Sequence, residues 1–118
     1  MASDDEKNLF QQNVWSGNFG NSYIDRNNDL HKVNSQYKES TGFSKDEVFH
    51  DFFNEFSREF SILEVGCNIG LNLSILESMG FQNLYGLEIN KKAIEIAKKN
   101  NANIKFFHSS FEDFNTNL

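Results

Sequence analysis

The segment from Ser61 to Leu76, "SILEVGCNIGLNLSIL", joins a short apolar run to a helical pattern through two glycines, Gly66 and Gly70. A short apolar run that ends at a glycine is typical of a buried strand. The apolar residues that follow Gly70 recur at helical spacing. The sequence therefore predicts a strand, a tight turn and a helix in immediate succession.

The alternation continues to the end of the chain. "NLYGLEI" (83–89) predicts a second strand, "NKKAIEIAKKN" (90–100) a second helix with Asn90 as its N-cap, and "NIKFFHS" (103–109) a third strand. Strands that alternate with helices through short links favour parallel pairing with right-handed crossovers. We therefore expect an α/β fold, half of a doubly wound sheet with strand order 3-2-1 and helices on both faces.

The first part of the chain has a different rhythm, and we divide the sequence into a helical segment, residues 1–60, and a βαβαβ unit, residues 61–118. "WSGNFGNSYIDRN" (15–27) predicts a loop that leads into a short helix, and residues 27–40 predict a weaker helix. Ser44 and Glu47 form a capping box for a helix over 44–56. An apolar stripe in that helix is expected to be core: Val48, Phe49, Phe52, Phe53 and Phe56.

Composition excludes several classes of function. The net charge is -6, and no basic face that would displace counterions from nucleic acid is visible. No apolar run is long enough to span a bilayer, and the acidic N-terminus does not resemble a signal sequence. The single cysteine, Cys67, fits a reducing compartment, so a cytoplasmic location is expected. His31, His50 and His108 lack metal-ligand spacing, so no metal site is expected.

The turn after the first strand is the candidate site. In parallel α/β folds, ligands bind where strands end and helices begin. Gly66, Asn68 and Gly70 suit the backbone angles of a tight turn. Glu88 ends the second strand, where a carboxylate can accept hydrogen bonds from a ribose diol. The alternative is that the glycines only shape a turn and that Glu88 is a solvated strand end.

The glycine spacing discriminates between nucleoside ligands. Counted from Gly66, the third and sixth positions of a dinucleotide fingerprint are Asn68 and Leu71, so that fingerprint fails. The spacing E-x-G-x-x-x-G, from Glu64 to Gly70, resembles motif I of class I S-adenosylmethionine-dependent methyltransferases. Together with "WSGNFGNSYIDRN" and "LYGLEINKKAIEIAKKN", residues 12–111 resemble more narrowly the pseudaminic acid biosynthesis-associated methylases.

This resemblance implies a Rossmann-like half-domain, S-adenosylmethionine as cofactor and roles for particular residues. The loop under the methionine part of the cofactor would contain Glu64, Gly66, Asn68 and Gly70. Glu88 would hold the ribose, and the adenine would be bordered by Ile89, Ser109, Ser110 and Phe111. Tyr23 and Arg26 would fold over the site, with Arg26 either facing the methionine carboxylate or acting as an ordinary surface arginine. Cys67 is expected to pack beneath the loop as a small apolar residue instead of serving as a nucleophile.

The resemblance also implies a methyl acceptor that is a sugar or a related small molecule, and a sheet that stops after the third of seven strands. Most acceptor contacts would then lie outside this chain, and no catalytic residue is assigned. The alternative function is a non-catalytic nucleoside-binding remnant or an interaction module; a nucleotide-dependent oxidoreductase ranks third. An exposed first strand over residues 62–65 favours self-association, cover by residues 19–24, or poor solubility.

Overall fold

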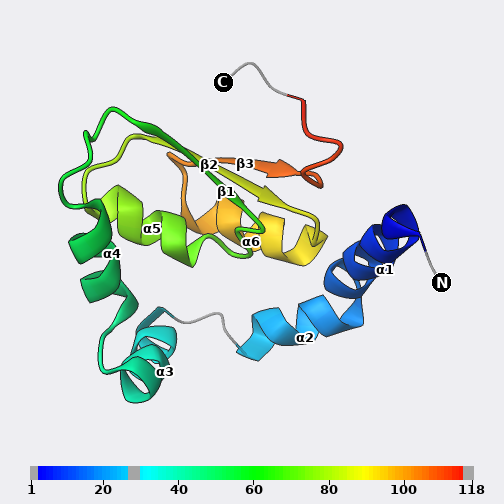
Figure 1. The fold of residues 1–118 in the computed structure, drawn as a ribbon, viewed down its shortest axis with the longest axis horizontal. Coiled ribbons are helices and arrows are strands. Elements are labelled where there is room, and N and C mark those ends of the chain that lie inside the picture. Colours follow the sequence, from blue (N-terminus) through cyan, green and yellow to red (C-terminus); the bar gives the residue numbers. More distant parts are fainter. Residues whose placement is uncertain (1–2, 27–29, 116–118) are drawn as a thin grey trace.

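A computed structural model describes residues 3–26 and 30–115 of the chain (Figure 1). Four helices precede a three-stranded sheet, and two further helices connect its strands. In chain order the elements are α1 (Asp4–Ser16), α2 (Asn18–Arg26), α3 (Leu30–Thr41), α4 (Lys45–Phe53), β1 (Ser61–Val65), α5 (Leu71–Ser78), β2 (Asn83–Glu88), α6 (Lys91–Asn100) and β3 (Lys105–His108).

The sheet confirms the expected topology. Its strands are parallel and ordered β1-β2-β3, with Val65 opposite Leu87 and Glu88 opposite His108. All three strands therefore end at the same edge of the sheet, where the two connecting helices begin. The α/β fold and the position of the turn between β1 and α5 are as the sequence predicts.

The expectation of helices on both faces of the sheet is wrong for the described residues. Two right-handed crossovers that step in the same direction must place their helices on one face, and α5 and α6 both lie below the sheet in Figure 1. The packing agrees, because Leu73 of α5 and Ile94 and Ala97 of α6 belong to the same core cluster. Glu64 on β1 bonds to Asn72 on α5, so the even-numbered residues of β1 face this side. Leu63 on β1 has the opposite parity and faces away from these helices.

The hydrophobic core lies between the sheet and these two helices. Nine buried residues form its main cluster, and Phe49, Phe53, Ile62 and Met79 pack against it. The cluster consists of Cys67, Leu73, Leu76, Phe81, Leu84, Ile94, Ala97, Ile104 and Phe106. Cys67 is thus a packed residue beneath the loop, as expected. The core fixes α5 and α6 against the strands and so fixes the turns at their N-termini.

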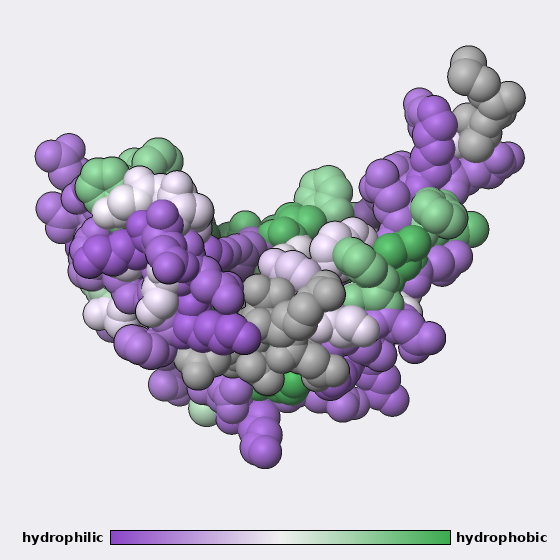
Figure 2. All heavy atoms as spheres, turned by 90° about the horizontal axis from the view of Figure 1, so that it is seen from below, coloured by the Kyte–Doolittle hydropathy of each residue, from purple (hydrophilic) through white to green (hydrophobic). Residues whose placement is uncertain are grey.

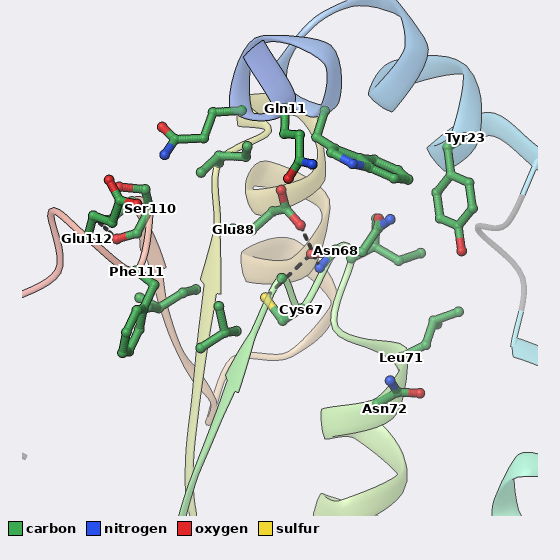
Figure 3. A pocket seen from close by; sticks show the side chains of 18 of the residues that line it. Gln11, Tyr23, Cys67, Asn68, Leu71, Asn72, Glu88, Ser110, Phe111 and Glu112 are labelled. Carbon is green, nitrogen blue, oxygen red and sulfur yellow. Dashed lines mark hydrogen bonds between the residues drawn. The ribbon is translucent and has the colours of Figure 1, made fainter. Parts of the chain in front are cut away.

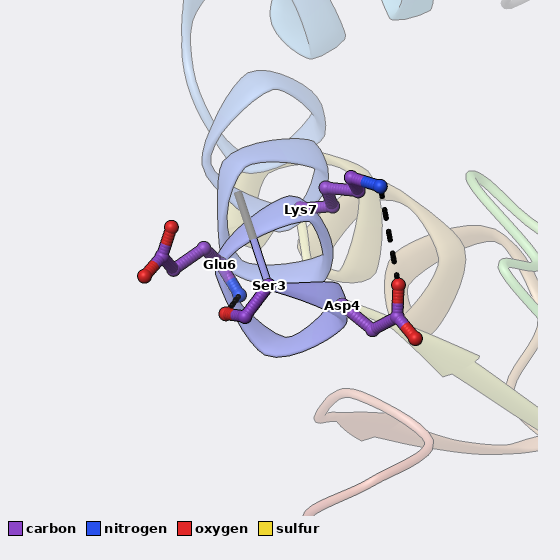
Figure 4. A network of polar contacts seen from close by, with 4 residues as sticks. All are labelled: Ser3, Asp4, Glu6 and Lys7. Atoms are coloured by element: carbon purple, nitrogen blue, oxygen red, sulfur yellow. Dashed lines mark hydrogen bonds and ion pairs between the residues drawn. The ribbon is translucent and has the colours of Figure 1, made fainter. Parts of the chain in front are cut away.

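The segment over 15–26 is more helical than predicted, and residue 27 lies outside the described residues. Ser3 caps helix α1, and its side chain accepts a hydrogen bond from the Glu6 amide (Figure 4). In the first turn, Lys7 Nζ lies 4.0 Å from Asp4 Oδ1. α1 continues to Ser16, and α2 begins at Asn18. The expected loop is therefore a break at Gly17 between two helices.

A second small cluster and two hydrogen bonds attach this helical arm to α6. Ile24 of α2 is buried against Ile69 and Ala93. The side chain of Asn90, which caps α6 as predicted, also donates to the Trp15 carbonyl at 2.9 Å and to Asn21 Oδ1 at 2.7 Å. Residues 19–24 therefore pack near the start of α6 and not along the free edge of β1.

Helix α4 has the predicted capping box between Ser44 and Glu47, but its apolar stripe is not core. Phe49 and Phe53 pack against the main cluster, whereas Phe52 and Phe56 are 66% and 39% exposed. Helical spacing shows only that the side chains share a wide face. α4 contacts α3 and α5 alone among the more closely packed elements, so much of that face remains uncovered.

The surface is mixed in character. In Figure 2, apolar side chains gather on the right over the α1–α2 arm, and hydrophilic side chains dominate the left. Exposed apolar residues of the arm include Leu9, Phe10, Trp15 and Phe19. Within residues 3–26 and 30–115, none of the helices has the length and apolar character needed to cross a membrane.

The close packing of Gly70 gives a test of the fold. Gly70 has φ +84°, and a Cβ on it would lie 2.9 Å from Phe106 Cζ. Gly42 has φ +87° with open space around the same position. In both alanine variants, the strain of a left-handed backbone should lower the free energy of unfolding by about 1–2 kcal/mol. In Gly70→Ala, overpacking should lower it by about 1–3 kcal/mol more. Urea unfolding should therefore give a lower free energy of unfolding for Gly70→Ala than for Gly42→Ala, and equal values would contradict the packing described.

Candidate functional site

A cavity of about 550 Å³ lies at the edge where the strands end (Figure 3). Its floor is formed by the β1–α5 turn, the end of β2 and the segment after β3, and α1 lies across it. The lining residues that carry polar or charged groups include Asn8, Gln11, Gln12, Trp15, Tyr23, Lys45, Asn68, Asn72, Glu88, Ser109, Ser110 and Glu112. The volume lies in the range of small-molecule sites.

The two glycines of the turn have different structural roles. Gly66 has φ +73°, and a Cβ there would meet nothing within 4 Å, so its missing side chain leaves open space at the cavity wall. Gly70 instead allows α5 to start close to Phe106. Between them, Asn68 has φ +53°, which asparagine tolerates better than most residues. The amides of Gly66 and Cys67 both donate to the Leu87 carbonyl, at 2.8 and 2.9 Å.

Glu88 holds this turn in place. Its Oε1 accepts a hydrogen bond from the Asn68 amide at 2.9 Å, and its Oε2 accepts one from the Asn90 amide at 2.8 Å. Glu88 is 8% exposed, so the alternative of a solvated strand end is wrong. A carboxylate has about four acceptor positions. The two that remain face a cavity where a ligand with hydroxyl donors can use them.

Two buried oxygen atoms near the turn have no hydrogen-bond partner within the described chain, Asn68 Oδ1 and Glu64 Oε1. Buried polar atoms are rarely left unpaired in proteins, because each costs about 1–3 kcal/mol. Asn68 lines the cavity, whereas Glu64 lies behind it on β1. Both oxygens are closed off from solvent, so they add to the cost of shaping the turn.

Glu64 belongs to a chain of side chains that reaches α4. Asn72 Nδ2 donates to Glu64 Oε2 at 2.8 Å, and Lys45 Nζ donates to Asn72 Oδ1 at 3.2 Å. Burial raises the pKa of Glu64, and the Glu88 charge adds to this effect, while the Asn72 hydrogen bond and Lys45 oppose it. Burial and the same two carboxylates raise the pKa of the Cys67 thiol, which does not favour a nucleophilic role.

The far end of the cavity is formed by the segment after β3. Ile89, Ser109, Ser110 and Phe111 all line it, and the Ser109 amide donates to the Glu88 carbonyl at 3.1 Å. Phe111 is 65% exposed, so its ring is available to a ligand. Asn8 on α1 donates to Glu112 Oε1 at 3.0 Å and links α1 to this end.

Most of the predicted site residues therefore meet at one cavity. Gly66, Asn68, Glu88 and Tyr23 line it, together with the four residues of the far end. Glu64 and Gly70 lie behind the wall and support it. Arg26 ends α2, but its side chain lies outside the described part of the chain.

Sequence reasoning missed the contributions of α1 and α4. Asn8, Gln11, Gln12 and Trp15 follow the spacing i, i+3, i+4 and i+7 and share the face of α1 that lines the cavity. That spacing was a visible signal, but polar residues on one helix face are ordinarily interpreted as solvent-facing. Lys45, at the first position of α4, and Asn72 carried no signal, because only folding brings them together.

The raised pKa of Glu64 predicts a pH-dependent stability. A carboxyl with a higher pKa in the folded than in the unfolded state binds more protons when folded, so stability falls as pH rises above about the ordinary value of 4.5. Glu64→Gln should remove this contribution, while its side-chain oxygen still accepts from Asn72. Between pH 4.5 and 7, the free energy of unfolding should decline less steeply for Glu64→Gln than for the exposed control Glu95→Gln. Identical slopes would contradict the burial cost.

Comparison with known protein families gives a match over the second half of the chain. Residues 63–117 match the family described as Methyltransferase domain. No curated protein matches the chain.

Solved structures agree with the sequence match. A crystal structure of the plantazolicin methyltransferase BpumL in complex with a pentazolic desmethylPZN analog and SAH has 19% identity and a TM-score of 0.54, covering 98% of this chain. Another, with SAH alone, has 22% identity and a TM-score of 0.51, covering 75%. The chain spans 38% and 37% of those two chains. Residues 63–117 thus carry the sequence pattern of a methyltransferase domain, and the described chain shares a Rossmann-like fold with part of a solved methyltransferase.

Proposed function

We propose that this chain binds S-adenosylmethionine and forms the cofactor-binding part of an S-adenosylmethionine-dependent methyltransferase. The observation that carries the proposal is the hydrogen bond between the Gly66–Gly70 turn and the buried Glu88 carboxylate at the floor of one cavity. SAH in the BpumL structures, which share the fold, gives further support.

The residues present fit such a cofactor. Glu88 has acceptor positions left for the ribose hydroxyls, and Ile89 and Phe111 offer apolar surface for the adenine. Asn68 lines the cavity where the methionine part would lie. The open space at Gly66 allows the ligand to approach the backbone.

S-adenosylmethionine supplies a methyl group on a sulfonium, which reacts by in-line displacement. The contribution of this chain is to hold the cofactor and to exclude water. α1 lies across the cavity and would limit solvent access. None of the described residues is assigned as a general base.

For the acceptor, we propose a sugar or a related small molecule, on the resemblance to the pseudaminic acid biosynthesis-associated methylases. The cavity wall supports a hydroxyl-rich molecule, because the face of α1 presents three side-chain amides, Asn8, Gln11 and Gln12, beside Trp15. Amides both donate and accept hydrogen bonds, as hydroxyl groups require.

Calorimetric titration tests the cofactor. The unmodified chain should bind S-adenosylmethionine or SAH in preference to NAD. Gly66→Val should abolish binding, because the valine side chain projects into open space at the cavity wall and also strains the turn. Gly42→Val is the matched control, since Gly42 has a similar φ and open surroundings, and it does not line the cavity. Binding lost in both variants would point to strain alone, and tight NAD binding would refute the proposal.

We also propose that the chain self-associates through β1. β1 is an edge strand of the described sheet, Val65 is 54% exposed, and the only charge on the strand, Glu64, faces α5. An apolar edge without outward charges is a template for pairing.

Light scattering over a dilution series tests the pairing. The unmodified chain should show a concentration-dependent mass above that of the monomer. Leu63→Lys should shift the mass toward the monomer, while Phe10→Lys, the same kind of change on the exposed surface of α1, should not. A monomer at all concentrations would exclude the pairing, and an equal effect of both variants would place the contact elsewhere.

A further inference from the structure

We infer that Lys45 recognises the carboxylate of the methionine part of the cofactor; this inference rests on the proposed function. Among the described residues that line the cavity, Lys45 is the one cationic side chain, and Glu88 and Glu112 are the acidic ones. An anionic group on a bound ligand therefore finds its counter-charge at Lys45 and repulsion near the two carboxylates.

The Lys45 ammonium is held in place from several sides. Its Nζ donates to Asn72 Oδ1 at 3.2 Å and lies 6.0 Å from the centre of the Tyr37 ring. Its backbone amide donates to Asn34 Oδ1 at 3.1 Å, which fixes the start of α4 against α3. An ammonium has three donors, so two remain for a ligand after the bond to Asn72.

The order of groups along the cavity matches the order of groups in the cofactor. In Figure 3, Phe111 and Ser110 lie at one side, Glu88 and Asn68 in the middle, and Asn72 at the other side. With the nucleoside at the side of Glu88 and Phe111, the amino-acid part extends past Asn68 toward Asn72.

Lys45 donates to Asn72, so it stands where the carboxylate arrives. Asn68 lines the same stretch of the cavity, between Glu88 and Asn72. Lys45 thus supplies a donor for the carboxylate at the amino-acid end of the cofactor.

A pair of ligands isolates this contact. SAH carries the amino-acid part, and 5′-methylthioadenosine is a nucleoside thioether that lacks it. Lys45→Met should lower the affinity for SAH about 10- to 100-fold, which is the range of a hydrogen bond to a charged group. It should change the affinity for methylthioadenosine less than about twofold. Lys45→Arg should retain most of the SAH affinity, because it keeps the charge. Lys98→Met, the same change on the exposed last turn of α6, should leave both affinities unchanged.

Each alternative result has a distinct meaning. Equal weakening of both ligands by Lys45→Met would assign Lys45 a structural role and overturn the inference, as would unchanged SAH binding. If the unmodified chain bound methylthioadenosine at least as tightly as SAH, the carboxylate contact would be refuted while the nucleoside site stood. If it bound neither ligand, the proposed function would fail together with this inference.

Discussion

The site depends on one buried carboxylate. Glu88 accepts a hydrogen bond from the Asn68 amide on one side and from the Asn90 amide on the other. It thereby joins the turn after β1 to the start of α6, although the two segments are distant in sequence. Asn90 in turn caps α6 and donates to the Trp15 carbonyl and to Asn21. The position of the helical arm over the cavity therefore follows from the same network that shapes its floor.

The βαβαβ unit was predictable because its signals are local. Gly66, Gly70 and the Asn90 cap each act within a few residues of their own position, and the apolar runs between them have clear lengths and periods. The strand order follows from connection length and handedness. The same rule requires α5 and α6 to share one face, so the expectation of helices on both faces failed through incomplete use of the rule and not through a missing signal.

The exposure of the α4 stripe and the contact between Lys45 and Asn72 could not be predicted from the sequence, because both depend on how helices pack against one another. The stripe on α4 has core spacing, yet Phe52 is exposed because no described element covers that side. Lys45 and Asn72 meet only after α4 packs on α5. Site residues were predicted correctly where they are neighbours in one turn. They were missed where a side chain of a separate helix, such as Lys45 of α4, lines the cavity.

The carboxylates near the turn do not by themselves decide which nucleoside ligand the cavity takes. Burial raises the pKa of Glu64, which disfavours its charged form, and Glu64 lies behind the cavity wall. Glu88 lines the cavity, but an acid at the end of the second strand can accept hydrogen bonds from the ribose of a dinucleotide as well as from that of S-adenosylmethionine. The discriminating feature is therefore the backbone of the turn: with Asn68 and Leu71 at the third and sixth positions from Gly66, the glycines that would admit a pyrophosphate are absent, so the turn disfavours the oxidoreductase alternative.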